Sequence, residues 1–167
     1  MGHRVTGIAL ALAFLTAALP LPLSAAPTTP TGLLDMDASG LPQGAAVDIT
    51  MGRAQLAALS LGAGDATTAE LLSGLETVHL RQYLTPSDEI VAVAEGLPAQ
   101  LEAAGWVQTQ HQVHENRHLF IHALSDAGSC AGFVVLVIDP GVLVAIANVV
   151  GDVPPAQLAQ LGLPLTP

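Results

Sequence analysis

The sequence has no lysine, and Cys130 is its single cysteine. The lack of lysine excludes Schiff-base catalysis and P-loop phosphate binding, because both need a lysine amine. One cysteine cannot form an intrachain disulfide, so packing must stabilise the fold. Positive charge is scarce, since 4 Lys and Arg stand against 14 Asp and Glu and the net charge is −10 at pH 7. A chain this acidic repels phosphate groups, which argues against nucleic acid and anionic membranes as partners.

The first residues have the pattern of an export signal. Arg4 precedes the apolar run VTGIALALAFLTAALPLPL, and LSAAP then offers small residues for cleavage. We expect residues 1–26 to be a signal peptide, 27–45 a flexible leader rich in Pro, Gly and Thr, and 46–164 a single domain. An uncleaved membrane anchor is the less favoured alternative. The predicted location is the periplasm, with no membrane span left after cleavage.

Hydrophobic periodicity and turn residues predict an α+β fold. Apolar and alternating patterns predict strands at 46–51, 76–84, 106–115, 117–124, 129–139 and 142–151. Helical spacing and capping residues predict helices at 52–62, 65–75, 85–105 and 154–162. The resulting order is β-α-α-β-α-β-β-β-β-α. Four strands joined by short loops favour a mostly antiparallel sheet of about six strands, with helices packed mainly on one face.

The strands at 133–138 and 142–147 are apolar on both sides. A strand that is buried on one face alternates between apolar and polar residues, and these two do not. Either helices cover both faces of the sheet, or the second face meets a partner. We favour the second explanation and expect a homodimer formed through the apolar strands 133–150.

No candidate catalytic residue emerges from the sequence. GSCAG at 128–132 has the spacing of a nucleophile elbow, but a strand follows it where an elbow needs a helix. We therefore expect Cys130 to be an inert strand residue. No serine lies in a strand-turn-helix context that would support a Ser-His-Asp triad. The chain is expected not to be an enzyme and to need no cofactor.

Four of the six histidines lie in HQVHENRHLFIH at 111–122, which reads as a hairpin. A turn at Asn116–Arg117 would place His111 opposite His122. A register shifted by one residue instead places His114 opposite His118, with His122 on the same wet face and His111 on the apolar side or at its margin. We prefer the shifted register because it gathers the apolar residues on one face.

In the preferred register, His114 and His118 are a candidate pair of zinc or copper ligands, although no third ligand is evident. Solvated polar side chains are the simpler interpretation of the hairpin. A third is a pH sensor, because an imidazole pair protonates unevenly below neutral pH. The metal pair remains the alternative function that we carry forward.

Several stretches of the chain resemble a bacterial exported family known as domain of unknown function 4252. The stretches are ELLSGLETVHLRQY, LEAAGW and VAIANVVGDVPPAQLAQLG, and the most specific pieces are GW at 105–106 and NVVGD at 148–152. The resemblance covers roughly residues 46–162. It implies export across the inner membrane of Gram-negative bacteria and an association with envelope stress or signalling. It supplies no catalytic motif.

The function predicted from these observations is that of a non-enzymatic envelope domain, which acts by self-association or by binding another envelope protein. The alternative is weak binding of a metal or small ligand by the histidine-rich hairpin 111–122.

Overall fold

The computed structural model describes residues 32–126 and 129–152. The strands are β1 (Val47–Gly52), β2 (Leu75–Leu84), β3 (Val107–His114), β4 (Arg117–Asp126), β5 (Ser129–Asp139) and β6 (Leu143–Gly151). The helices are α1 (Arg53–Leu61), α2 (Ala66–Gly74) and α3 (Asp88–Ala103). The predicted signal peptide and the predicted helix at 154–162 lie outside the described residues. Within the described ranges, no helix is long and apolar enough to cross a membrane.

All six strands form one antiparallel sheet in the order β1-β2-β6-β5-β4-β3. Strands β3 to β6 form the meander that the short loops predict, and β6 returns to pair with β2. The α+β class, the antiparallel sheet and the order of the described elements are therefore confirmed.

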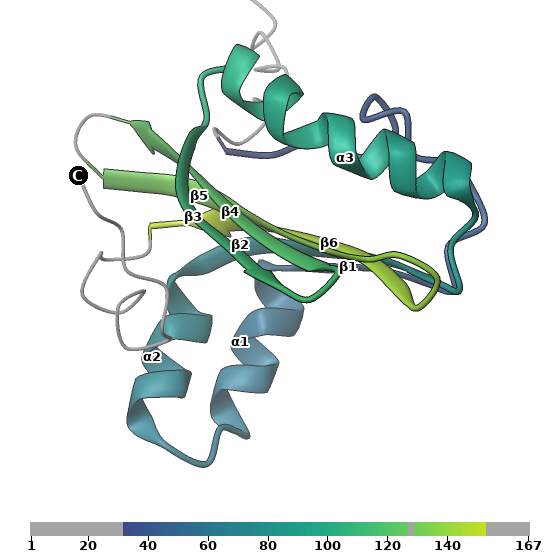
Figure 1. Cartoon of the computed structure of the whole chain (residues 1–167). Helices are drawn as coiled ribbons and strands as arrows, with labels where there is room; N and C mark the ends of the chain where they lie inside the picture. Colours follow the sequence, from purple (N-terminus) through teal and green to yellow (C-terminus); the bar gives the residue numbers. More distant parts are fainter. Residues whose placement is uncertain (1–31, 127–128, 153–167) are drawn as a thin grey trace, which may run out of the picture.

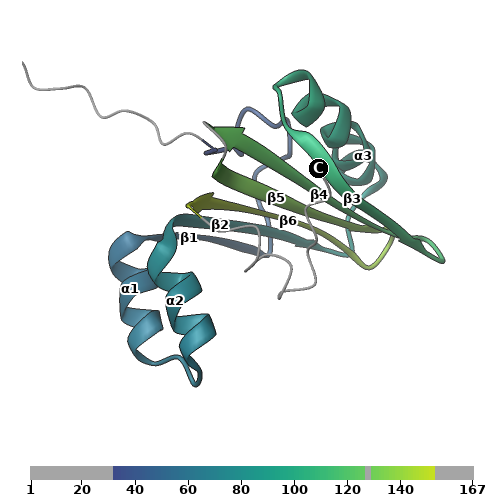
Figure 2. The same cartoon turned by 90° about the vertical axis from the view of Figure 1, so that its left-hand side faces the viewer.

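The three helices are divided between the two faces of the sheet. Helix α3 lies over one face, whereas α1 and α2 project from the other (Figures 1 and 2). This division corrects the expectation that helices cover mainly one face. The α3 face buries Leu97 and Leu101 of the helix against Val134 and Leu136 of β5. The second face, which carries α1 and α2, buries Leu56, Ala123 and Phe133. Both sides of the first half of β5 therefore meet helices, which accounts for the lack of alternation there.

Residues 32–45, predicted to belong to a flexible leader, pack on the α3 face. Met36 and Leu41 are almost fully buried in the core beneath α3. The segment approaches the sheet closely at Gly32 and Gly132. There is no room for a side chain at this point, since a Cβ on Gly132 would lie 3.0 Å from the carbonyl oxygen of Gly32. The expected flexibility is wrong for these residues, because two apolar side chains of a segment rich in Pro and Gly are anchored in the core.

Local signals explain where the elements begin and turn. Asp65 caps α2 by accepting a hydrogen bond from the backbone N–H of Thr68 at 2.8 Å. Ser87 caps α3 by accepting from the N–H of Ile90 at 3.4 Å. The chain turns between β3 and β4 through two residues, and the first of them, Glu115, has the left-handed φ of 54° that such a turn uses.

Candidate functional site

The β3–β4 hairpin has neither of the two registers considered from the sequence. His114 pairs with Arg117, His111 with Phe120, and Val113 with His118. The predicted pairing of His114 with His118 is therefore wrong, and these two side chains point to opposite faces of the sheet. The expectation that burial of the apolar residues fixes the register does not hold for β3. It is an edge strand, and its Val113 is 57% exposed.

The structure instead brings His111 and His118 together on the α3 face. Nε2 of His111 lies 3.4 Å from Nδ1 of His118. The His111 ring also stacks on Phe120, with ring centres 4.2 Å apart and planes inclined by 12°. His111 is exposed and His118 is half-buried, so solvent reaches the pair. A one-residue difference in register replaces the predicted histidine pair by another.

His114 lies at the tip of the hairpin on the second face. It borders a polar hollow of about 460 Å³ together with Glu115, Arg117 and Asp139. Arg117 and Asp139 already form an ion pair of 2.8 Å across this hollow. In the part of the chain that the structure describes, no three His, Cys, Asp or Glu residues are grouped so that they could hold a metal ion.

His122 is completely buried, although it was expected on a wet face. It lies opposite Val134 on the α3 face, and neither ring nitrogen has a hydrogen-bond partner. Burial lowers the pKa of His122, because the charged imidazolium would lose its hydration. Glu102 of α3 acts in the opposite direction and raises it. His122 is thus a neutral imidazole whose protonation the fold opposes.

Cys130 lies in β5 and is buried. Its Sγ–H donates to the carbonyl oxygen of Gly132 at 3.4 Å, and burial raises the pKa of the thiol. A raised pKa depletes the thiolate, which is the nucleophilic form of cysteine. The geometry agrees with the interpretation of SCAG, at 129–132, as part of a strand.

An unpredicted cluster surrounds Arg81 of β2. Its guanidinium is buried and contacts Asp48 at 2.8 Å and Asp37 at 3.0 Å, while a further N–H donates to the carbonyl oxygen of Met36. Nε2 of His79 lies 2.8 Å from the same Asp48. Because Asp37 belongs to segment 32–45, the cluster ties that segment to the sheet. The alternating sequence of β2 gives no signal for this cluster, because Arg81 falls on the same side of the strand as His79 and Tyr83.

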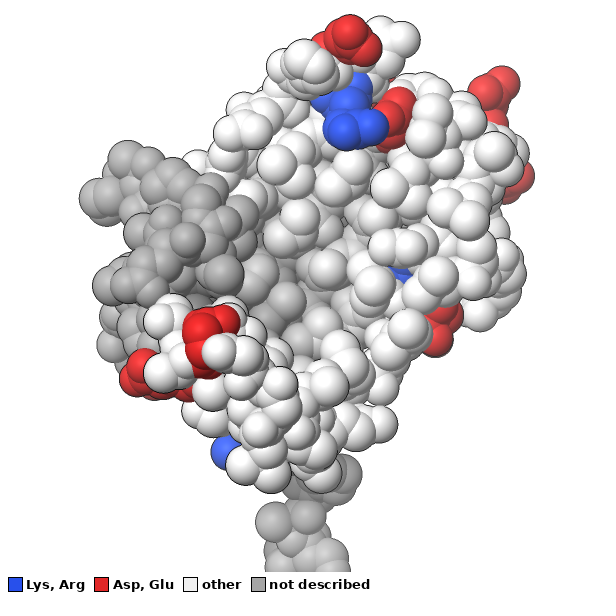
Figure 3. Space-filling view, turned by 90° about the horizontal axis from the view of Figure 1, so that it is seen from below, with Lys and Arg blue, Asp and Glu red and all other residues white. Residues whose placement is uncertain are grey.

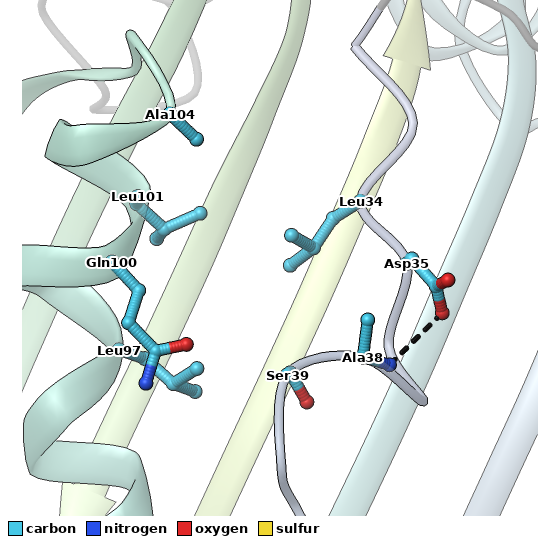
Figure 4. Close-up of a pocket in the computed structure, with 8 residues that line it drawn as sticks. All are labelled: Leu34, Asp35, Ala38, Ser39, Leu97, Gln100, Leu101 and Ala104. Carbon is cyan, nitrogen blue, oxygen red and sulfur yellow. Dashed lines mark hydrogen bonds between the residues drawn. The ribbon is translucent and has the colours of Figure 1, made fainter.

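A small groove separates the C-terminal half of α3 from segment 32–45 (Figure 4). Leu34, Ala38 and Ser39 line one wall, and Leu97, Gln100 and Leu101 line the other. Its volume is about 190 Å³. Sites for organic ligands usually enclose about 300–1,000 Å³. The groove is therefore too small for a typical cofactor.

The second face carries an apolar patch beyond the ends of α1 and α2. Six apolar side chains from five strands line this patch: Ile49, Leu80, Leu84, Leu119, Val137 and Ala147. Gln82 of β2 lies between Leu80 and Leu84 on the same face. Leu84 is 61% exposed and Ile49 is 47% exposed. The only charged side chains that the strands place beside the patch are Arg117 and Asp139, which neutralise each other. Figure 3 shows this face, with charged side chains lying mainly toward its rim.

The fold and the sites thus define an α+β domain with one six-stranded antiparallel sheet. No protein-family model matches the chain, and no curated protein is similar enough to count as a relative. The resemblance to the exported family of unknown function therefore stays a prediction.

Proposed function

We propose that this chain is a non-enzymatic exported domain that acts by self-association through the apolar patch of its second face. The observation that carries the proposal is the exposure of Leu84 and Ile49 in a patch beside which the strands place only the ion-paired Arg117 and Asp139. Large exposed apolar areas on soluble domains mark interaction sites.

The occupant that fits the patch best is a second copy of the chain. The net charge of −10 makes two copies repel each other over most of their surfaces. The patch is the region where two copies can approach without bringing carboxylates together. Sheets that pack face to face through apolar side chains are a common arrangement, and a two-fold axis through the patch makes it self-complementary.

A non-enzymatic role is supported by the placement of the nucleophilic groups. Among the described residues, no hydroxyl or thiol is hydrogen-bonded to a histidine ring, which is the contact that activates a nucleophile. Export to the periplasm and a role in envelope signalling rest on the signal-like sequence at 1–26 and on the family resemblance.

Sedimentation equilibrium of the purified protein at micromolar concentration tests the proposal. The expected result is a mass that rises toward that of a dimer as the concentration increases. A mass that stays at that of one chain over this range would overturn it.

A further inference from the structure

Two imidazole nitrogens on neighbouring strands lie within reach of a single ion. His111 of β3 and His118 of β4 share the α3 face, and the facing atoms, Nε2 and Nδ1, are 3.4 Å apart. Both are potential ligands, because a neutral imidazole nitrogen without a proton offers a lone pair.

The separation of these nitrogens matches tetrahedral coordination. With Zn–N bonds of about 2.0–2.1 Å, two ligands of a tetrahedral ion lie roughly 3.3–3.4 Å apart. Adjacent ligands of a square-planar copper(II) ion lie closer, at roughly 2.8 Å for the same bond length. The observed 3.4 Å is thus compatible with two ligands of one tetrahedral zinc ion. The two rings are stacked with their planes inclined by 22°, so both must rotate before their lone pairs meet at one point.

The pair is also accessible and partly fixed in place. Stacking on Phe120 restricts the ring of His111, which lowers the entropy that binding costs. Apart from their contact with each other, the two rings have no hydrogen-bond partner in residues 32–126 and 129–152. Binding of an ion therefore replaces one hydrogen-bond contact, the one between the two rings.

The other described histidines lack this combination. His79 is engaged by Asp48, His122 is enclosed beneath α3, and His114 lies on the opposite face. The net charge of −10 attracts cations to the whole surface, and the one arginine of the hairpin, Arg117, is paired with Asp139.

We propose that His111 and His118 bind one zinc(II) ion, with water completing its coordination. His111 would then carry its proton on Nδ1 and His118 on Nε2, which leaves the two facing nitrogens free. The proposal is independent of self-association, because it concerns the α3 face rather than the apolar patch.

Isothermal titration of the tag-free protein with zinc chloride at pH 7.5 tests this site, with H111Q, H118Q and H114Q as variants. His111 and His114 are exposed and His118 is half-buried, so circular dichroism checks that each variant folds as the parent does. The expected result is a saturable zinc site that weakens by roughly tenfold or more in H111Q and in H118Q. H114Q is the matched control and should bind zinc as the parent does.

Resonances of the imidazoles in a ¹H–¹⁵N NMR spectrum supply a second readout. Zinc should shift the signals of His111 and His118 and leave that of His122 unchanged. Binding should also disappear at low pH, because protonated imidazoles cannot act as ligands. The proposal is overturned if the parent binds no zinc, if H111Q and H118Q bind it unchanged, or if H114Q weakens binding equally.

Discussion

Asn148 of β6 holds the backbone of Leu34 through its side-chain amide. Its Oδ1 accepts a hydrogen bond from the Leu34 N–H at 2.9 Å, and its Nδ2 donates to the carbonyl oxygen of Gly32 at 3.0 Å. Asn148 is fully buried; its bond to Gly32 is buried, and its bond to Leu34 is partly buried. One polar side chain in the middle of an apolar strand thus fastens segment 32–45 to the sheet.

Replacing Asn148 by Ala should lower the free energy of unfolding by about 1–3 kcal/mol. The variant leaves the half-buried N–H of Leu34 and the buried carbonyl oxygen of Gly32 without their side-chain partner, and unsatisfied groups inside a fold cost energy of this order. Urea denaturation measures the change. Q100A, at an exposed position of α3, is the control and should unfold like the parent. An N148A variant as stable as the parent would show that the segment does not depend on this amide.

Arg81 should contribute to resistance against acid. Its hydrogen bonds lower the pKa of Asp37, and His79 together with Arg81 lowers the pKa of Asp48. A carboxyl whose pKa is lower in the folded state stabilises the fold above its ordinary value of 3.8, and this contribution is lost as the pH falls through the folded-state pKa. R81M should therefore be less stable than the parent at neutral pH, and the difference should shrink below pH 3.8.

The urea midpoint, followed through this acid range, measures that difference. At neutral pH we expect a loss of about 2 kcal/mol from the broken charged hydrogen bonds. R53M is the control, because Arg53 is 69% exposed in its pair with Glu76. An equal loss of stability in both variants would contradict the role assigned to burial.

Acidification should also act through His122. The lowered pKa means that the unfolded state binds a proton near 6.5 while the folded state stays neutral. Protonation of His122 therefore favours the unfolded state. The free energy of unfolding is unaffected by this histidine above about pH 6.5 and declines as the pH falls below it. H122L should be at least as stable as the parent near neutral pH, because it removes two buried unpaired nitrogens.

Thermal unfolding followed between about pH 8 and 5 compares the two proteins in the range where histidine titrates. The H122L curve should be flatter than that of the parent, and H114Q should follow the parent because His114 is exposed. Parallel curves for H122L and the parent would exclude His122 as a source of acid sensitivity.

Cys130 should resist alkylation in the native protein. The thiol is buried and its pKa is raised, so both access and thiolate are limited. Mass spectrometry after treatment with iodoacetamide should detect no adduct under native conditions and one adduct in urea. Rapid modification of the native protein would reopen the question of a reactive cysteine.

The order of the elements could be predicted, because hydrophobic periodicity and helix-capping residues depend only on neighbouring positions in the sequence. Strands such as β5 and β6 are read directly from their continuous apolar runs. The position of the helices could not be predicted in the same way. Whether α1 lies on the same face as α3 depends on the path of the chain at Gly52, where β1 runs directly into α1.

The histidine pair failed to be predicted for two physical reasons. The turn consists of Glu115 and Asn116, and a register shift lies between Gln108 and Gln110 of β3. Such an irregularity moves every side chain beyond it to the opposite face of the sheet, and the composition of the strand does not reveal it. Arg81 and Asn148 were missed because their partners lie far away in the sequence, in the segment taken for a leader.

Sedimentation velocity of L84E beside L61E tests the central claim, that the apolar patch joins two copies. Both changes place a carboxylate on an exposed leucine, since Leu84 is 61% and Leu61 is 90% exposed, but Leu61 lies at the end of α1 outside the patch. If the patch joins two copies, L84E should sediment as a monomer at concentrations where the parent and L61E are dimers. A dimer that persists in L84E, or one that L61E disrupts equally, would contradict it.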